Sequence, residues 1–108
     1  MIITEPLDYL DFMRLVKDGR LILTDSGGIQ EEAAYLKVPT ITLRESTERP
    51  STIECGANHL HHLGNLRSII KKVEKIMGTK KHIISDIPLF DGRASERIIE
   101  IIKNKYRI

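Results

Sequence analysis

The sequence predicts an α/β fold: a three-layer domain in which about four parallel strands lie between helices. Short apolar runs of strand type alternate with segments of helical periodicity along the chain. Three of the expected helices are followed by residues that end helices, namely Gly19, Pro39 and Gly78. A chain of 108 residues with 41% hydrophobic content can form one domain of this kind.

The expected elements alternate between strand and helix. The strands are expected at residues 2–4, 21–24, 40–43 and 58–63. The polar alternation of the last of them indicates a strand near an edge of the sheet. The helices are expected at residues 7–17, 29–36, 51–55, 65–77 and 94–103, and residues 80–90 are expected to be irregular.

The most informative stretch lies between the second strand and the helix after it. Ser26, Gly27 and Gly28 follow the apolar run at residues 21–23. Glycine allows a sharp turn and lets a ligand come close to the backbone. The free N–H groups and the positive dipole end of the helix would then face an anion. This pattern predicts a phosphate cradle, and the alternative is an ordinary turn with Asp25 or Ser26 as the helix cap.

Charged residues near the expected cradle suggest how it is completed. Arg44 and Arg49 follow the third strand, and loops after parallel strands emerge at the same edge of a sheet. A guanidinium donates to phosphate in pairs, so both arginines could face the anion. The alternative is that they pair with Glu45 and Glu48 on a solvated loop. Glu32 would repel a phosphate but could accept hydrogen bonds from sugar hydroxyls.

Several linked motifs resemble those of the non-hydrolysing UDP-N-acetylglucosamine 2-epimerases. The main ones are TDSGGIQEEA at residues 24–33 and LRESTERP at residues 43–50. EPLDYLDF at residues 5–12, ECG at 54–56 and FDGRA at 90–94 occur in the family's order. The resemblance implies the GT-B fold of two Rossmann-like domains, with this chain corresponding to the C-terminal part.

The resemblance implies one incomplete, UDP-binding Rossmann-like domain over residues 1–108. It assigns UDP binding to Ser26, Gly27, Gly28, Glu32 and Arg49. It implies no metal and no other cofactor, and no catalytic residue is assigned, because the family's acids and histidine lie upstream of this part.

The expected function is therefore the UDP-binding portion of an isomerase that interconverts UDP-GlcNAc and UDP-ManNAc, inactive without the N-terminal domain. One alternative is a nucleotide-sugar-binding subunit of a split GT-B glycosyltransferase. Another is a piece with no independent activity.

The chain departs from the family pattern at three places. Lys37 replaces the usual glycine after the helix, so this helix end lacks a residue that readily adopts the left-handed conformation. Ser51 replaces the glutamate that usually follows TERP. His59, His61 and His62 lie in the fourth expected strand, and alternation would let the first two share a metal ion. Polar lining of the cleft or surface exposure is favoured over a metal site.

Composition bounds the partners. Net charge is +2 and only 5% of residues are aromatic, so no nucleic-acid binding is expected. No signal peptide or transmembrane run is found, so a cytoplasmic location without membrane contact is expected. The single cysteine, Cys55, is expected to be a buried structural thiol.

The expected partners are UDP or a UDP-sugar and a second protein chain. The final helix is apolar around much of its circumference, through Ile98, Ile99, Ile101 and Ile102. The sheet is also expected to have an open edge. A homodimer is therefore expected, or a partner chain that supplies the N-terminal domain.

Overall fold

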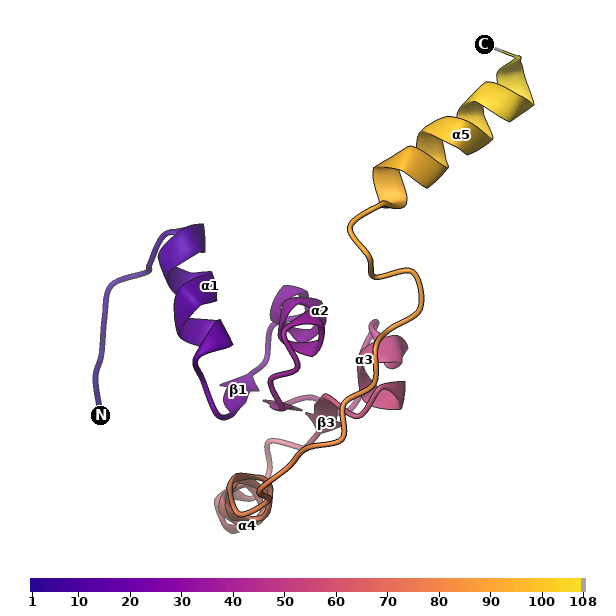
Figure 1. Ribbon diagram of the computed structural model, residues 1–108. Coiled ribbons are helices and arrows are strands. Elements are labelled where there is room, and N and C mark those ends of the chain that lie inside the picture. Colours follow the sequence, from indigo (N-terminus) through magenta and orange to yellow (C-terminus); the bar gives the residue numbers. More distant parts are fainter. Residues whose placement is uncertain (108) are drawn as a thin grey trace.

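The computed structural model describes residues 1–107, and within them the chain has an α/β architecture around one parallel sheet (Figure 1). The strands are β1 (Ile22–Thr24), β2 (Thr40–Thr42) and β3 (Asn58–Leu60), in the order β1-β2-β3. All three residues of β2 are buried, as expected for the central strand of a covered parallel sheet. The predicted fold class is confirmed.

Helices connect and flank these strands. They are α1 (Tyr9–Lys17), α2 (Gly28–Tyr35), α3 (Pro50–Glu54), α4 (Leu66–Met77) and α5 (Ala94–Tyr106). Two of them have side-chain caps, because Asp8 accepts from the N–H of Asp11 in α1 and Asn65 accepts from the N–H of Ser68 in α4. The predicted helices are confirmed, and no helix end differs from the prediction by more than three residues.

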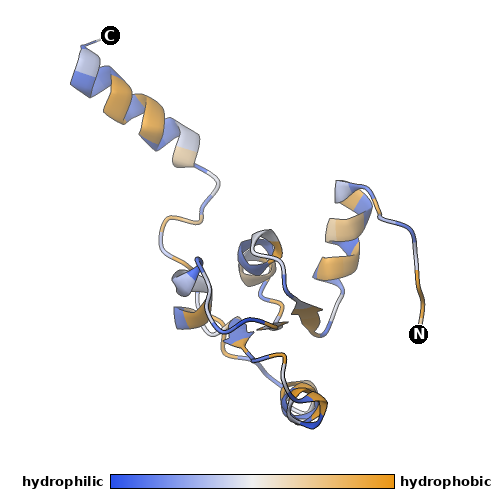
Figure 2. Cartoon of the chain, turned by 180° about the vertical axis from the view of Figure 1, so that it is seen from behind, coloured by the Kyte–Doolittle hydropathy of each residue, from blue (hydrophilic) through white to orange (hydrophobic). Residues whose placement is uncertain are grey.

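The helices lie on both sides of the sheet. Figures 1 and 2 both place α4 on the opposite side of the sheet from α1 and α2. Ile69 and Ile76 are the buried residues of α4. Another apolar cluster joins Ala34 of α2 to Ala57 and to Ile84 in the irregular segment after α4. This arrangement fixes the loops that follow β1 and β2 at one edge of the sheet.

The strand expected at residues 2–4 is wrong, so the sheet has three strands rather than four. These residues form exposed chain outside the sheet, and Ile2 and Ile3 are 90% and 83% exposed. An apolar run of three residues gains a strand conformation only where a neighbouring strand accepts its hydrogen bonds. The fourth expected strand is found at β3, shorter than predicted and at a sheet edge.

Lys37 adopts the left-handed conformation at the end of α2. Its φ is +59°, a region that favours glycine, so the lysine backbone is strained there. Its Nζ lies 2.7 Å from Oδ1 of Asp86 and donates to the backbone oxygen of Ile84 at 3.3 Å. The side chain thus fastens the irregular segment to the end of α2.

Helix α5 extends away from the rest of the molecule (Figure 1). The molecule as a whole, with α5, measures 58 × 30 × 27 Å along its principal axes. None of its residues is buried, and Ile98 and Ile101 are 56% and 64% exposed. Figure 2 shows apolar stripes along it. Among the helices of the described residues, none has the length and apolar character needed to cross a membrane.

Candidate functional site

The N-terminus of α2 faces outward without a side-chain cap. Its cap residue is Gly27, and no side chain accepts a capping hydrogen bond from the backbone N–H groups of the first turn. The alternative prediction, a cap from Asp25 or Ser26, is therefore wrong. The N–H of Ser26 donates to Oγ1 of Thr24 at 3.0 Å, so its hydroxyl is the group left to meet a ligand. The dipole end of α2 is the kind of position that favours an anion.

The two glycines provide space rather than an unusual backbone conformation. Gly27 has φ −74° and ψ −40°, which any residue adopts, and Gly28 is not among the residues with positive φ. The chain bends at Gly27, as expected, but the bend does not need a conformation that only glycine adopts. A Cβ built on Gly28 would meet nothing within 4 Å. Glycine within a helix lowers stability relative to alanine by about 0.5–1 kcal/mol. Neither backbone strain nor crowding explains why residue 28 is a glycine.

Both arginines beside the cradle are held by carboxylates. Nε of Arg49 lies 3.1 Å from Oε1 of Glu31, in the first turn of α2. Nη1 of Arg44 lies 3.0 Å from Oε2 of Glu48. The alternative of pairing within the loop is therefore correct for Arg44, whereas Arg49 reaches the helix that carries the cradle. Arg49 is thus beside the first turn of α2, as the phosphate hypothesis requires.

The carboxylate of Glu48 lies against the cradle. A Cβ built on Gly27 would clash with Oε1 of Glu48. The backbone N–H of Glu48 lowers the pKa of its carboxyl, and Arg44 and Arg49 lower it further. A negative charge therefore already occupies the neighbourhood of the exposed helix N-terminus.

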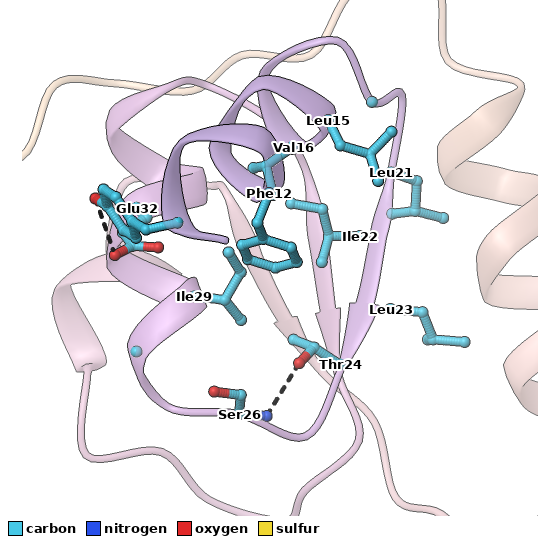
Figure 3. Close-up of a pocket in the computed structure, with 13 residues that line it drawn as sticks. Phe12, Leu15, Val16, Leu21, Ile22, Leu23, Thr24, Ser26, Ile29 and Glu32 are labelled. Carbon is cyan, nitrogen blue, oxygen red and sulfur yellow. Dashed lines mark hydrogen bonds between the residues drawn. The ribbon is translucent and has the colours of Figure 1, made fainter. Parts of the chain in front are cut away.

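A cavity of about 630 Å³ opens between α1, β1 and α2, next to the cradle (Figure 3). Ser26, Gly28 and Glu32 line it, so three of the five expected UDP-binding residues share one cavity. Arg49 and Gly27 are not among its lining residues. Oε1 of Glu32 accepts a hydrogen bond from the hydroxyl of Tyr9 at 3.5 Å.

Phe12 also lines the cavity, and the sequence analysis did not assign it to the site. It projects from α1 into the cavity, near Ile22 of β1 and Ile29 of α2 (Figure 3), and is 40% exposed. An aromatic ring beside a phosphate cradle offers a flat surface for a nucleobase. Its place within the motif EPLDYLDF was the one indication that the sequence offered.

His59 and His62, in and after β3, have different surroundings. Nδ1 of His62 lies 2.9 Å from Oε1 of Glu45. Burial lowers the pKa of His59, and Lys72, His82 and Lys75 lower it further. Within residues 1–107, no three His, Cys, Asp or Glu side chains come together as a metal-binding group.

Cys55 is buried, as predicted. It is 7% exposed, and its Sγ donates to the backbone oxygen of Thr52 at 3.2 Å. The thiol is therefore part of the packed interior and not of the cradle.

Taken together, the chain is an α/β domain in which the N-terminus of α2, without a side-chain cap, lies at the carboxyl edge of a parallel sheet. Beside it lies a loop that carries two arginines and two glutamates. Comparison with known proteins gives the family. The family model described as UDP-N-acetylglucosamine 2-epimerase matches residues 1–103, and the chain belongs to this family. It corresponds to the C-terminal portion of the family's GT-B fold.

Individual relatives agree in sequence and in structure. A UDP-N-acetylglucosamine 2-epimerase of Methanocaldococcus jannaschii is 50% identical over 101 residues, which cover 93% of this chain and 26% of the relative. The crystal structure of the Methanocaldococcus jannaschii UDP-GlcNAc 2-epimerase in complex with UDP-GlcNAc and UDP has a TM-score of 0.80 at 48% identity, covering 94% of this chain and 27% of that one.

The S. aureus MnaA–UDP co-structure has a TM-score of 0.84 at 37% identity, covering 95% of this chain and 29% of that one. This chain therefore spans about a quarter of the length of the relatives it matches.

Proposed function

We propose that this chain is the UDP-binding portion of a UDP-N-acetylglucosamine 2-epimerase, with residues 1–108 acting as a single, incomplete nucleotide-binding domain. The observation that carries the proposal is the free N-terminus of α2, with the unobstructed Gly28, opening into the cavity beside it. Family membership supports UDP as the ligand, because relatives were crystallised with UDP and UDP-GlcNAc.

Each proposed binding residue has a separate task. The N–H groups of Gly27 and Gly28 and the hydroxyl of Ser26 donate to the diphosphate. Arg49 adds a cation after exchanging its contact with Glu31 for one with phosphate. Glu32 accepts from the ribose hydroxyls after releasing Tyr9.

We infer a task for Phe12 as well, because it lines the cavity: its ring provides the surface on which the uracil ring lies. The ring and the helix N-terminus thus bind opposite ends of one nucleotide.

These groups contribute to epimerisation by stabilising the leaving group. UDP departs from C1 of the sugar when the C1–O bond breaks, and the electron pair stays on the β-phosphate. Donors already aimed at the phosphate stabilise this negative charge without rearranging. Removal and return of the C2 proton require acids and bases within hydrogen-bond reach, and these belong to the N-terminal part of the family.

A second chain is part of the proposal. Four isoleucines of α5 are more than 40% exposed, and covering 500 Å² of such surface contributes roughly 12 kcal/mol before association costs. We infer a homodimer, or a partner chain that supplies the N-terminal domain. Light scattering coupled to size exclusion over a hundredfold dilution tests the homodimer. A mass of 12.3 kDa at every concentration would contradict the homodimer and favour a different partner chain.

The proposed location is the cytoplasm. A single buried thiol without a disulfide partner suits a reducing compartment. Fractionation of cells that express the chain tests this proposal.

Titration calorimetry of the chain with UDP, UDP-GlcNAc and inorganic phosphate tests the nucleotide site. We expect both nucleotides to bind more tightly than phosphate. The chain alone should not convert UDP-GlcNAc to UDP-ManNAc, as followed by proton NMR. Absence of UDP binding would contradict a self-sufficient nucleotide site. Turnover proportional to chain concentration would contradict the proposal that the acid and base groups belong to the N-terminal part.

A further inference from the structure

Five polar side chains are buried beneath the candidate site. Gln30, Thr40, Thr42 and Thr52 have no exposed surface, and Asn58 is 2% exposed. Burying such groups is costly unless each is hydrogen-bonded. Every buried side-chain nitrogen and oxygen in the described residues has a partner. Four of the five, all but Thr40, belong to one connected network.

Gln30 is the centre of this network. Its Nε2 donates to the backbone oxygen of Ser26 at 3.0 Å. Its Oε1 accepts from Oγ1 of Thr47 at 2.6 Å and from Nδ2 of Asn58 at 2.8 Å. One side chain of α2 therefore holds the cradle loop, the loop after β2 and strand β3.

The network continues to the backbone of Arg49 on both sides. The N–H of Arg49 donates to Oγ1 of Thr47 at 3.0 Å. The backbone oxygen of Arg49 accepts from Oγ1 of Thr52 at 2.6 Å, and Thr52 in turn accepts from Nδ2 of Asn58 at 3.1 Å. The segment that carries the guanidinium is thus fixed through Gln30 relative to the cradle.

Asn58 is itself held in one orientation. Its Oδ1 accepts from Oγ1 of Thr42 at 2.6 Å, which leaves both Nδ2 hydrogens for Gln30 and Thr52. Because the network is anchored in the central strand, its geometry is set by the sheet and not by the surface loops.

We propose that Gln30 is a positioning residue that joins the two halves of the anion site, the Ser26–Gly28 loop and Arg49, into one preorganised unit. It touches no ligand itself. A ligand phosphate then meets donors at fixed separation and avoids the cost of ordering them. The ligand in this inference rests on the proposed function, whereas the coupling between the two loops does not.

The coupling is tested without ligand, on the whole chain. Thr47→Val removes the hydroxyl that links Gln30 to Arg49 at nearly constant shape, and Thr47→Ser restores it. Thr40→Val is the matched control, because the Thr40 hydroxyl donates to Val38 at 3.4 Å outside the network.

In Thr47→Val we expect faster hydrogen exchange at the Arg49 amide and shifted NMR signals at Ser26 and Gly27, with both restored in Thr47→Ser. Changes confined to residues 47–49, or equal changes in the Thr40 control, would overturn the inference.

The consequence for binding is tested with UDP and uridine, measured by calorimetry and ligand-observed NMR. Thr47→Val should weaken UDP binding about tenfold while uridine binding stays unchanged, because only the phosphate meets the positioned groups. Equal losses for both ligands would show a merely structural role and would overturn the inference. A parent chain that binds no UDP would refute the proposed function, and the amide signals would still decide the coupling.

Discussion

Gly28→Ala should stabilise the ligand-free chain and weaken its binding of UDP. Gly28 is the first residue of α2 and a Cβ there meets nothing within 4 Å, so alanine fits without strain. Fewer conformations of the unfolded chain then raise the free energy of unfolding by about 0.4–1 kcal/mol. The same methyl lies in the space that the phosphate needs, and UDP affinity should fall about tenfold or more, or about 1.4 kcal/mol.

Gly92→Ala is the matched control. A Cβ on Gly92 also meets nothing within 4 Å, but its φ is +77°. Alanine is strained there, and the free energy of unfolding should fall by about 1–2 kcal/mol. Gly92 is not among the residues that line the candidate UDP cavity, so UDP affinity should not change.

Urea denaturation followed by far-UV circular dichroism, at one protein concentration, gives the stability of each variant. Calorimetric titration gives UDP affinity. If Gly28→Ala lowers stability, the fold itself requires glycine at this position and the argument for a ligand fails. If its UDP affinity equals that of the parent, the phosphate binds elsewhere.

Other substitutions test the surrounding charges and the backbone. Arg49→Ala should weaken UDP binding by about 1–3 kcal/mol, measured by calorimetry, because it removes a charged donor. Glu48→Gln should strengthen UDP binding in the same titration, because it removes a negative charge beside the cradle. Lys37→Gly should be more stable to urea than Lys37→Ala by about 1 kcal/mol, because only glycine relieves the positive φ.

The pH dependence of the free energy of unfolding tests His59. Burial lowers the pKa of this side chain in the folded chain, so the unfolded chain takes up its proton first as the pH falls. The contribution of His59 to stability is therefore complete above about pH 6.5 and is lost as the pH falls below that value.

Each of these predictions can fail separately. Unchanged UDP affinity in the Arg49 variant would show that this side chain stays with Glu31. Weaker binding by the Glu48 variant would make that carboxylate a ligand contact. Equal stability of the two Lys37 variants would show that the left-handed conformation carries no strain. His59→Asn should remove part of the stability loss below about pH 6.5, and an unchanged profile would assign that loss to other groups.

The elements that sequence predicted well are those whose ends have a local chemical cause. Asn65 caps α4 with its own side chain, and Gly78 follows its last turn, so both ends could be inferred from residue type. The strand predicted at residues 2–4 is wrong. A strand forms only beside a neighbouring strand that completes its hydrogen bonds, and an apolar run of three residues does not specify that neighbour.

The site was predicted in part, for a similar reason. The glycine pair and Arg49 could be found from spacing along the chain. Gln30 could not, because helical periodicity treats a glutamine as solvent-facing, and its burial depends on partners contributed by β3 and by the loop after β2. Thr40 and Thr42, within the strand expected at residues 40–43, were the available signal of a polar interior, and both are buried.

The exposure of α5 makes its helicity conditional. A helix of 13 residues without burial is marginal in water, because its backbone hydrogen bonds barely offset the entropy of ordering. The ion pairs at its start, Arg93 with Glu96 and Asp91 with Arg97, contribute little each. A surface that covers α5 must also order the helix. The conformational entropy that the segment loses on ordering reduces the free energy of association. In the proposed association, folding of α5 and recognition of its partner would therefore be a single event.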